Sequence, residues 1–245
     1  MNSLLLENAR WLAVDKPAGI TVIPARDEDP ALALRQRLES ELGAPLWVVH
    51  RIDRDTSGVV LFARDADAHR ELNFAFEHGQ VHKTYLAYTA GVPVPLSGRI
   101  DMALHTARKG KMRPAQSGEP GAKEARTDYR VEIERSFGEA RVARVRCHPR
   151  SGRQHQLRVH LRSLGCPILR DALYGMATVR APFDQLPVTR LALHAVRLEL
   201  PALLGIAAHA IEAPLPADLQ ALDEWLRAGN QTAVLEHPAA QSLAD

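Results

Sequence analysis

The chain has 245 residues, 46% of them hydrophobic, and a formal net charge of +2. That length suffices for one large domain or two small ones with a sizeable core. No apolar run reaches the roughly 20 residues of a membrane-spanning helix and no secretory leader is evident, so we expect a cytoplasmic protein without a membrane partner. The two cysteines, Cys147 and Cys166, are too few for a disulfide framework, and we expect both to be small buried side chains.

Four helices are predicted. The first spans residues 30–42, where Pro30 suits the first helical position. Asp29 offers its N-cap and Gly43 can end it. The others are expected over residues 66–78, 153–164 and 217–228, each closed by a following glycine.

Apolar segments bounded by turn residues predict strands at residues 11–14, 46–49, 59–63, 84–89, 125–133, 140–147 and 191–200. Two of them flank a Gly-containing turn at 136–139, which predicts a hairpin. Regular alternation of strand and helix is missing, so the pattern indicates an α+β fold with a mainly antiparallel sheet. We assign residues 1–229 to one domain and interpret the weakly patterned segment 230–245 as a loose C-terminal tail.

Positive charge is concentrated in residues 141–170, which carry eight arginines and no acidic residue. This segment is +8, so the remainder of the chain is −6. A second basic stretch, in a Gly-containing segment interpreted as a loop, includes Lys109, Lys111 and Arg113. Because guanidinium groups donate paired hydrogen bonds to phosphate, we expect a polyanionic partner. The alternative is that these arginines lie on solvated faces.

A polar cluster, His50 to Gly58, separates two hydrophobic strands. Charged groups set between buried strands lose hydration unless they are paired, and loops held by a sheet commonly carry catalytic groups. The structural alternative is a tight turn, since Asp55, Thr56 and Ser57 form turns readily and Gly58 can supply an unusual backbone angle. Residue types and spacing alone leave both interpretations open.

The tetrad His50-Arg51-Ile52-Asp53, followed by Thr56-Ser57-Gly58, resembles the signature of the RluA-type RNA pseudouridine synthases, in which this aspartate is catalytic. Further segments resemble family motifs in the same order, at residues 15–19 (DKPAG), 83–86 (KTYL), 152–161 (GRQHQLRVHL) and 190–195 (RLALHA). The resemblance covers residues 4–202. It implies the pseudouridine synthase fold, a bisected, mainly antiparallel sheet flanked by helices with a central active-site cleft.

The chain departs from the family at one turn. Relatives usually carry glycine before the aspartate that is Asp171 here, whereas this chain carries Arg170. The departure puts the turn in doubt and adds a positive charge. Many relatives also carry an N-terminal RNA-binding module of the S4 type, which we do not expect here because the first motif begins by residue 15.

The resemblance implies an isomerase that converts specific uridines in structured RNA, tRNA or rRNA, to pseudouridine without a cofactor or metal. Asp53 would be catalytic, kept ionised by Arg158. Tyr85 would stack on the target base, and Arg51 would fill the space of an extruded base or hold a phosphate. Leu157 completes the expected substrate-binding set. RNA-binding roles are expected for Arg153, Lys109, Lys111 and Arg113. We expect a monomer, with His50 and His194 in structural roles.

Three interpretations compete with this one. A zinc site could draw on Cys147, His148, His155, His160 and Cys166, but their spacing fits no paired-ligand pattern. The sequence Asp53-Arg54-Asp55 is also compatible with a sugar-nucleotide transferase, which would require a divalent ion. An RNA-binding or RNA-folding factor without catalysis is the third, although a carboxylate repels phosphate. The sequence does not indicate which RNA or uridine is modified, or whether Asp53 attacks the sugar, attacks the uracil or acts as a base.

Overall fold

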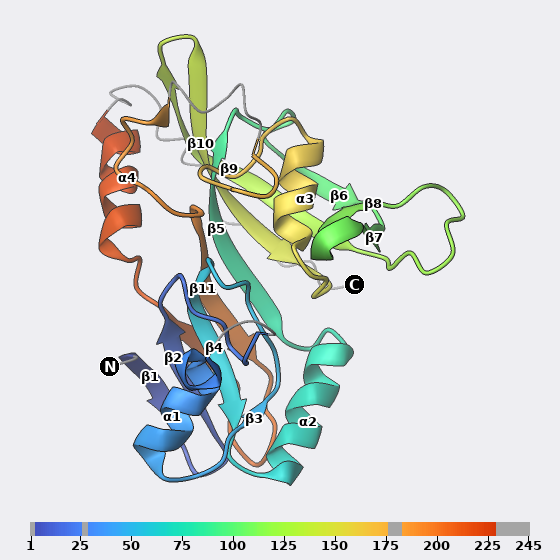
Figure 1. Ribbon diagram of the computed structural model, residues 1–245, viewed down its shortest axis with the longest axis vertical. Helices are drawn as coiled ribbons and strands as arrows, with labels where there is room; N and C mark the ends of the chain where they lie inside the picture. Colours follow the sequence, from blue (N-terminus) through green and yellow to red (C-terminus); the bar gives the residue numbers. More distant parts are fainter. Residues whose placement is uncertain (1–2, 26–28, 176–182, 229–245) are drawn as a thin grey trace.

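One large sheet, divided into two halves, organises the chain (Figure 1). The computed structural model describes residues 3–25, 29–175 and 183–228. The strands of the sheet are β1 (Ser3–Glu7), β2 (Trp11–Lys16), β3 (Trp47–Val48), β4 (Ser57–Ala63), β5 (His82–Ala90), β6 (Ser97–Asp101), β9 (Arg126–Phe137), β10 (Ala140–Pro149), β11 (Leu193–Leu200) and β12 (His209–Glu212). They lie in the order β1-β2-β4-β11-β5-β10-β9-β6, with β3 beside β4 and β12 beside β11.

Helices flank both halves of this sheet. Strands β1 to β4 form the first half with α1 (Leu34–Leu42), α2 (Ala66–Glu77) and the short 3-10 helix η1 (Pro30–Leu32). Strands β5, β6, β9 and β10 form the second half with α3 (Gln156–Ser163) and α4 (Ala217–Ala228). Strand β11, which lies between β4 and β5 and also pairs with β12, is counted with the second half. Beside α3 projects a separate hairpin of β7 (Leu104–Thr106) and β8 (Met112–Pro114), joined by the 3-10 helix η2 (Arg108–Gly110) (Figure 1).

The two halves meet where β4 and β11 pair in parallel, with His194 opposite Ser57 and Ala195 opposite Gly58. We call this contact the seam. The other strand pairs of the sheet are antiparallel, which confirms the predicted fold class. Gly58 has a φ of 117°, and a Cβ at this position would lie 2.2 Å from the Ala195 carbonyl oxygen. The close approach of the two backbones therefore requires glycine.

Strand β4 is buried on both faces, so the loops before and after it are attached to a rigid strand. Its alternation directs Val59 and Leu61 toward α2, where they pack with Leu72. Val60 and Phe62 point to the opposite face and join the core beneath α1. The second half has its own core, to which β5, β10, α3 and α4 contribute.

The structure corrects several predicted boundaries. The helix expected over 30–42 is split, because Ala33 is extended with ψ of 145°, and Asp29 caps only η1. The helix expected from residue 153 begins at Gln156, because His155 takes the left-handed conformation. The helix over 217–228 is confirmed. Strands at Ser3–Glu7, Ser97–Asp101, Leu104–Thr106, Met112–Pro114 and His209–Glu212 were not predicted, and the tail 230–245 lies outside the described residues.

Candidate active site

A cleft of about 980 Å³ lies between loops of the two sheet halves. The first half contributes the loop from Val49 to Thr56, which leads into β4. The second half contributes the loop from Pro149 to His155 and the start of α3. Tyr85, on β5, also lines the cleft. Residues more than 100 positions apart in the chain therefore face one another across it.

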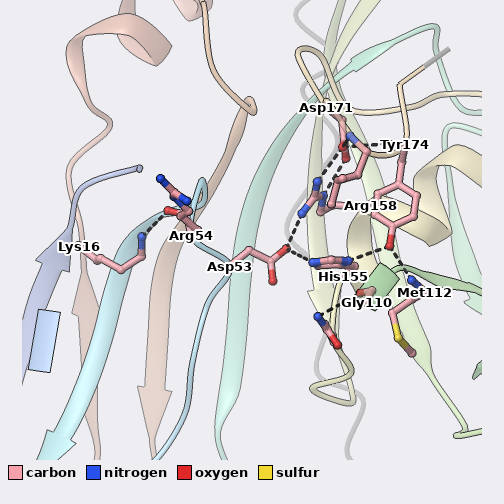
Figure 2. A network of polar contacts seen from close by, with 11 residues as sticks. Lys16, Asp53, Arg54, Gly110, Met112, His155, Arg158, Asp171 and Tyr174 are labelled. Atoms are coloured by element: carbon pink, nitrogen blue, oxygen red, sulfur yellow. Dashed lines mark hydrogen bonds and ion pairs between the residues drawn. The ribbon is translucent and has the colours of Figure 1, made fainter. Parts of the chain in front are cut away.

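A three-residue ionic network spans the cleft (Figure 2). Arg158 Nη1 donates to Asp53 Oδ2 at 3.1 Å, so the ion pair expected from the sequence is formed. The remaining edge of the guanidinium donates to Asp171, through Nε at 2.8 Å and Nη2 at 2.7 Å. Asp171 also accepts the backbone N–H groups of Leu173 and Tyr174. Asp171 is fully buried, Arg158 is 5% exposed, and the Asp53 side chain is 23% exposed.

The loop that carries Asp53 is fixed by a buried lysine. Lys16 Nζ donates to the carbonyl oxygens of Pro17, Ile20 and Arg54, each at 2.8 Å. Burial lowers the pKa of Lys16 to about 7, against the attraction of Asp55 and Asp53. Since Arg54 directly follows Asp53, the amino group ties the Asp53 loop to the end of β2 (Figure 2).

A second polar chain reaches Asp53 from the side of the hairpin (Figure 2). His155 Nε2 lies 3.9 Å from Asp53 Oδ2, and Nδ1 of the same ring lies 2.7 Å from the Tyr174 hydroxyl. That hydroxyl accepts the backbone N–H of Met112, on β8, at 2.8 Å. Burial lowers the pKa of His155, and the Asp53 carboxylate opposes the shift. The chain links the ionic network to the end of the β7–β8 hairpin next to η2. We call this the basic hairpin because it carries Lys109, Lys111 and Arg113.

The other expected substrate-binding residues differ in exposure. Tyr85 is half-buried in the cleft wall, and burial together with the charge of Asp53 raises the pKa of its hydroxyl, so it stays a phenol. Arg51 is exposed at the rim, with no ion pair among the described residues. Leu157 is 6% exposed and belongs mainly to the core of the second half, although it also lines the cleft.

Most arginines of the basic segment 141–170 are paired with acids from elsewhere in the fold. Six of the eight have such a partner: Arg141 with Glu134, Arg144 with Glu132 and Asp223, Arg146 with Glu132, Arg150 with Asp128, Arg158 with Asp53 and Asp171, and Arg170 with Asp184. Arg153 lines the cleft, and its Nε donates to the Glu124 carbonyl. The local charge count thus overstated the positive charge free to meet an anion.

The basic hairpin lies outside the cleft lining. The Lys111 side chain has no hydrogen-bond or ion-pair partner within the described residues. Arg113 donates two hydrogen bonds to Glu119, one of them at 2.8 Å. That arginine lowers the pKa of Glu119 to about 2. Lys109 belongs to η2, and its side chain lies outside what the structure describes.

Both histidines expected to be structural are held by internal hydrogen bonds. His50 Nε2 accepts the Leu61 N–H at 2.9 Å, and its ring stacks on Phe76. His194 Nδ1 lies 2.8 Å from the Ser57 hydroxyl at the seam. Burial lowers the pKa of His50 to about 3 and that of His194 to about 4.

Four polar residues of this site were missed or undervalued from the sequence: Lys16, His155, Asp171 and Tyr174. Arg170 stands where the family usually has glycine. Its backbone is left-handed, with φ of 59°, at the turn before Asp171. Its guanidinium donates to the Val188 carbonyl and to Asp184.

Among the described residues, no three His, Cys, Asp or Glu side chains gather as metal ligands would. No helix of the described part of the chain has the length and apolar character to cross a membrane.

Comparisons with known proteins match this arrangement to one family. The family model for RNA pseudouridylate synthase matches residues 10–163. The tRNA pseudouridine synthase C of Pasteurella multocida is 36% identical, over 80% of this chain and 84% of its own. The dual-specificity RNA pseudouridine synthase RluA of Escherichia coli is 34% identical, over 80% and 85%. The solved structure of human RNA pseudouridylate synthase domain containing 4 has 28% identity and a TM-score of 0.72, over 92% and 93%.

Proposed function

The chain belongs to the family of RNA pseudouridine synthases, of the RluA type, and is an isomerase, and from this membership we propose that it modifies specific uridines of tRNA or rRNA with Asp53 as the essential carboxylate. The carrying observation is the position of Asp53 in the cleft. One oxygen, Oδ2, is held by Arg158, while Oδ1 has no hydrogen-bond or ion-pair partner among the described residues. One oxygen of the carboxyl group is thus available to a substrate.

The reaction needs only a carboxylate and a way to hold the base. The bond between C1′ and N1 breaks, the uracil turns, and a bond forms between C1′ and C5. The C5 proton leaves and N1 gains a proton, so no oxidant, reductant or phosphate energy is consumed. Asp53 can act as the nucleophile toward the sugar or the uracil, or as the base that removes the C5 proton.

The cleft walls supply groups suited to an extruded nucleotide. A stacked uridine hides its glycosidic bond, so the base must leave the stack at a cost of a few kcal/mol. Tyr85 offers an aromatic ring beside Asp53, and Leu157 an apolar edge. Arg51 and Arg153 line opposite walls of the cleft, which supports a role for Arg51 in filling the vacated space or holding a phosphate, and for Arg153 in binding RNA.

Substitution Asp53→Asn tests the proposal, since it removes the charge at nearly constant volume. We expect RNA binding to be retained and turnover to fall at least about 10³-fold, as for other essential groups. Asp67→Asn, the same change on the exposed surface of α2, is the matched control. Retained turnover in the Asp53 variant would refute the assignment, and retained binding without product separates an enzyme from a pure RNA-binding factor.

The substrate and the rival metal chemistry are tested separately. One relative is named for tRNA, which favours tRNA among the candidates, and another is named only for dual specificity. Mapping pseudouridine in total RNA from cells with and without the gene should reveal positions lost with the gene.

We expect a chelator to leave turnover unchanged, whereas a sugar-nucleotide transferase using Asp53 and Asp55 would lose activity. We also propose a cytoplasmic monomer, testable by fractionation and light scattering.

A further inference from the structure

His155 occupies an unusual place in the cleft wall. Its backbone is left-handed, with φ of 54°, a conformation that is uncommon outside glycine, although histidine, asparagine and aspartate adopt it more often than other residues. The residue precedes α3, and its ring is held between Asp53 and Tyr174. Strained backbone at a site is commonly retained because it aims a side chain.

The hydrogen bonds around Tyr174 determine which ring nitrogen of His155 carries the proton. The buried Tyr174 hydroxyl already accepts the Met112 N–H, and its one proton needs an acceptor. The only described acceptor within hydrogen-bond distance is His155 Nδ1, at 2.7 Å. If Nδ1 carried the proton instead, the tyrosine proton would be buried without a partner, which is unfavourable. The proton of the neutral ring is therefore on Nε2.

The opposite side of the ring leads to the same assignment. Nε2 faces Asp53 Oδ2 at 3.9 Å, and a lone pair there would point at a carboxylate. An N–H group in that position is attracted instead. The other charged groups that face the ring are Arg158 and Asp171, which compensate each other through their paired hydrogen bonds.

We propose that His155 is a positioning residue, which Tyr174 holds as the neutral Nε2–H tautomer with its N–H directed at Asp53 Oδ2. This inference rests on the proposed role of Asp53. Together with Arg158, the ring confines Oδ2 and leaves Oδ1 for the substrate. Because Tyr174 also binds Met112, the orientation of His155 is linked to β8 and the basic hairpin.

Burial keeps the ring neutral near pH 7. The pKa of His155 is lowered by burial, so protonation of the ring should affect turnover only below its ordinary range. Removing the tyrosine hydroxyl frees Nδ1 to accept a proton, which should raise that pKa. An imidazolium would then pair with Asp53 at a higher pH and compete with the substrate for the carboxylate.

Nitrogen-15 NMR of histidine-labelled full-length protein tests the tautomer without RNA. We expect a protonated Nε2 and an unprotonated Nδ1 for His155 at pH 7, with the signal assigned by its absence in His155→Asn. Asparagine tolerates the left-handed backbone and so preserves the fold. A proton on Nδ1, or an imidazolium, would overturn the proposal. Because the NMR measurement involves no turnover, its outcome is independent of whether Asp53→Asn abolishes product formation.

The kinetic consequence is tested with Tyr174→Phe. We expect kcat to fall about tenfold, comparable with one hydrogen bond, and the acidic limb of the kcat profile to move to higher pH. Tyr88→Phe is the matched control, because Tyr88 is also buried and its hydroxyl donates to Asp223, away from the cleft. An unchanged profile in Tyr174→Phe, or an equal shift in Tyr88→Phe, would refute the link.

Discussion

The two walls of the cleft hold their polar residues by opposite means. On the first half, the Asp53 loop is anchored by a hydrogen-bond donor, the buried amino group of Lys16, through three backbone carbonyl groups. On the second half, Arg158 is anchored by a carboxylate, Asp171, through two side-chain hydrogen bonds. The anchored loop leaves Asp53 partly exposed, whereas the anchored arginine is nearly inaccessible.

Under the proposed function, this difference separates the reacting group from the group that holds it. A buried guanidinium paired on two sides keeps one geometry and one charge. Asp53 retains solvent access and an oxygen without a hydrogen-bond partner among the described residues, as a nucleophile or base requires. The sheet halves therefore contribute unequally, with a partly exposed carboxyl group on one and a buried, fixed guanidinium on the other.

The largest expected effect follows from removing the anchor of the second wall. Asp171→Ala leaves Arg158 with only Asp53, and breaking a buried ion pair costs about 3–5 kcal/mol. We expect a loss of that size in urea unfolding and a marked fall in kcat. Asp184→Ala, which removes an exposed partner of Arg170, should cost at most about 1 kcal/mol. Equal losses in the two variants would show that the walls are not held as described.

Removing the anchor of the first wall should cost less. Lys16→Met removes the donor of three carbonyl groups, which belong to the exposed or half-buried residues Pro17, Ile20 and Arg54. Because water can replace part of what is lost, we expect a total cost of about 1–3 kcal/mol. Because the loop moves with Arg54, we expect kcat to fall more than stability alone explains. Lys123→Met, on an exposed segment, is the control. Normal turnover in a folded Lys16 variant would show that this wall needs no buried amino group.

Acid should weaken the seam that joins the walls. The pKa of His194 is lowered to about 4 by burial, below its ordinary value of 6.5. The unfolded chain therefore binds the proton first as the pH falls, and stability is lost between about pH 6.5 and 4. The slope should be at most about 1.4 kcal/mol per pH unit. Urea unfolding should show a flatter dependence in His194→Asn, and an unchanged slope would contradict the assignment.

The smallest effects concern phosphate contacts on the two walls. Binding of RNA is measured at several salt concentrations. Arg51→Ala and Arg153→Ala should each reduce the slope of the logarithm of the RNA-binding constant against the logarithm of the salt concentration by about 1. Lys111→Ala should do the same if the hairpin also meets RNA. Arg113→Ala should change the slope less, because Glu119 already neutralises that arginine. An effect confined to one wall would show that RNA contacts only that half.

The sequence predicted the ion pair between Asp53 and Arg158, but not the groups that surround it. Asp53 and Arg158 lie in motifs with a recognisable pattern, and the strands beside them have clear apolar signatures. Asp171 was seen only as part of an altered turn, because its partner lies 13 residues earlier and its burial depends on the whole fold. Lys16 stood inside a recognised motif, yet its burial could not be inferred from residue types.

The charge of residues 141–170 illustrates the same limit. Local composition showed eight arginines without an acid, but β9 and α4 place Glu132, Glu134 and Asp223 beside them. Antiparallel pairing of β9 and β10 brings Glu132 and Glu134 beside the arginines of β10, and the packing of α4 adds Asp223, neither of which local composition reveals. The short strands β7, β8 and β12 were missed because their few residues carry too little pattern.

The contact between Gly58 and Ala195 has an evolutionary consequence. The two halves can meet at this distance only if one backbone lacks a side chain, so every other amino acid at position 58 would push the walls apart. A survey of tolerated substitutions is therefore expected to rank Gly58 with Asp53, although the glycine does not line the cleft. Intolerance to mutation at position 58 would reflect how closely β4 packs against β11, and not a role in the reaction.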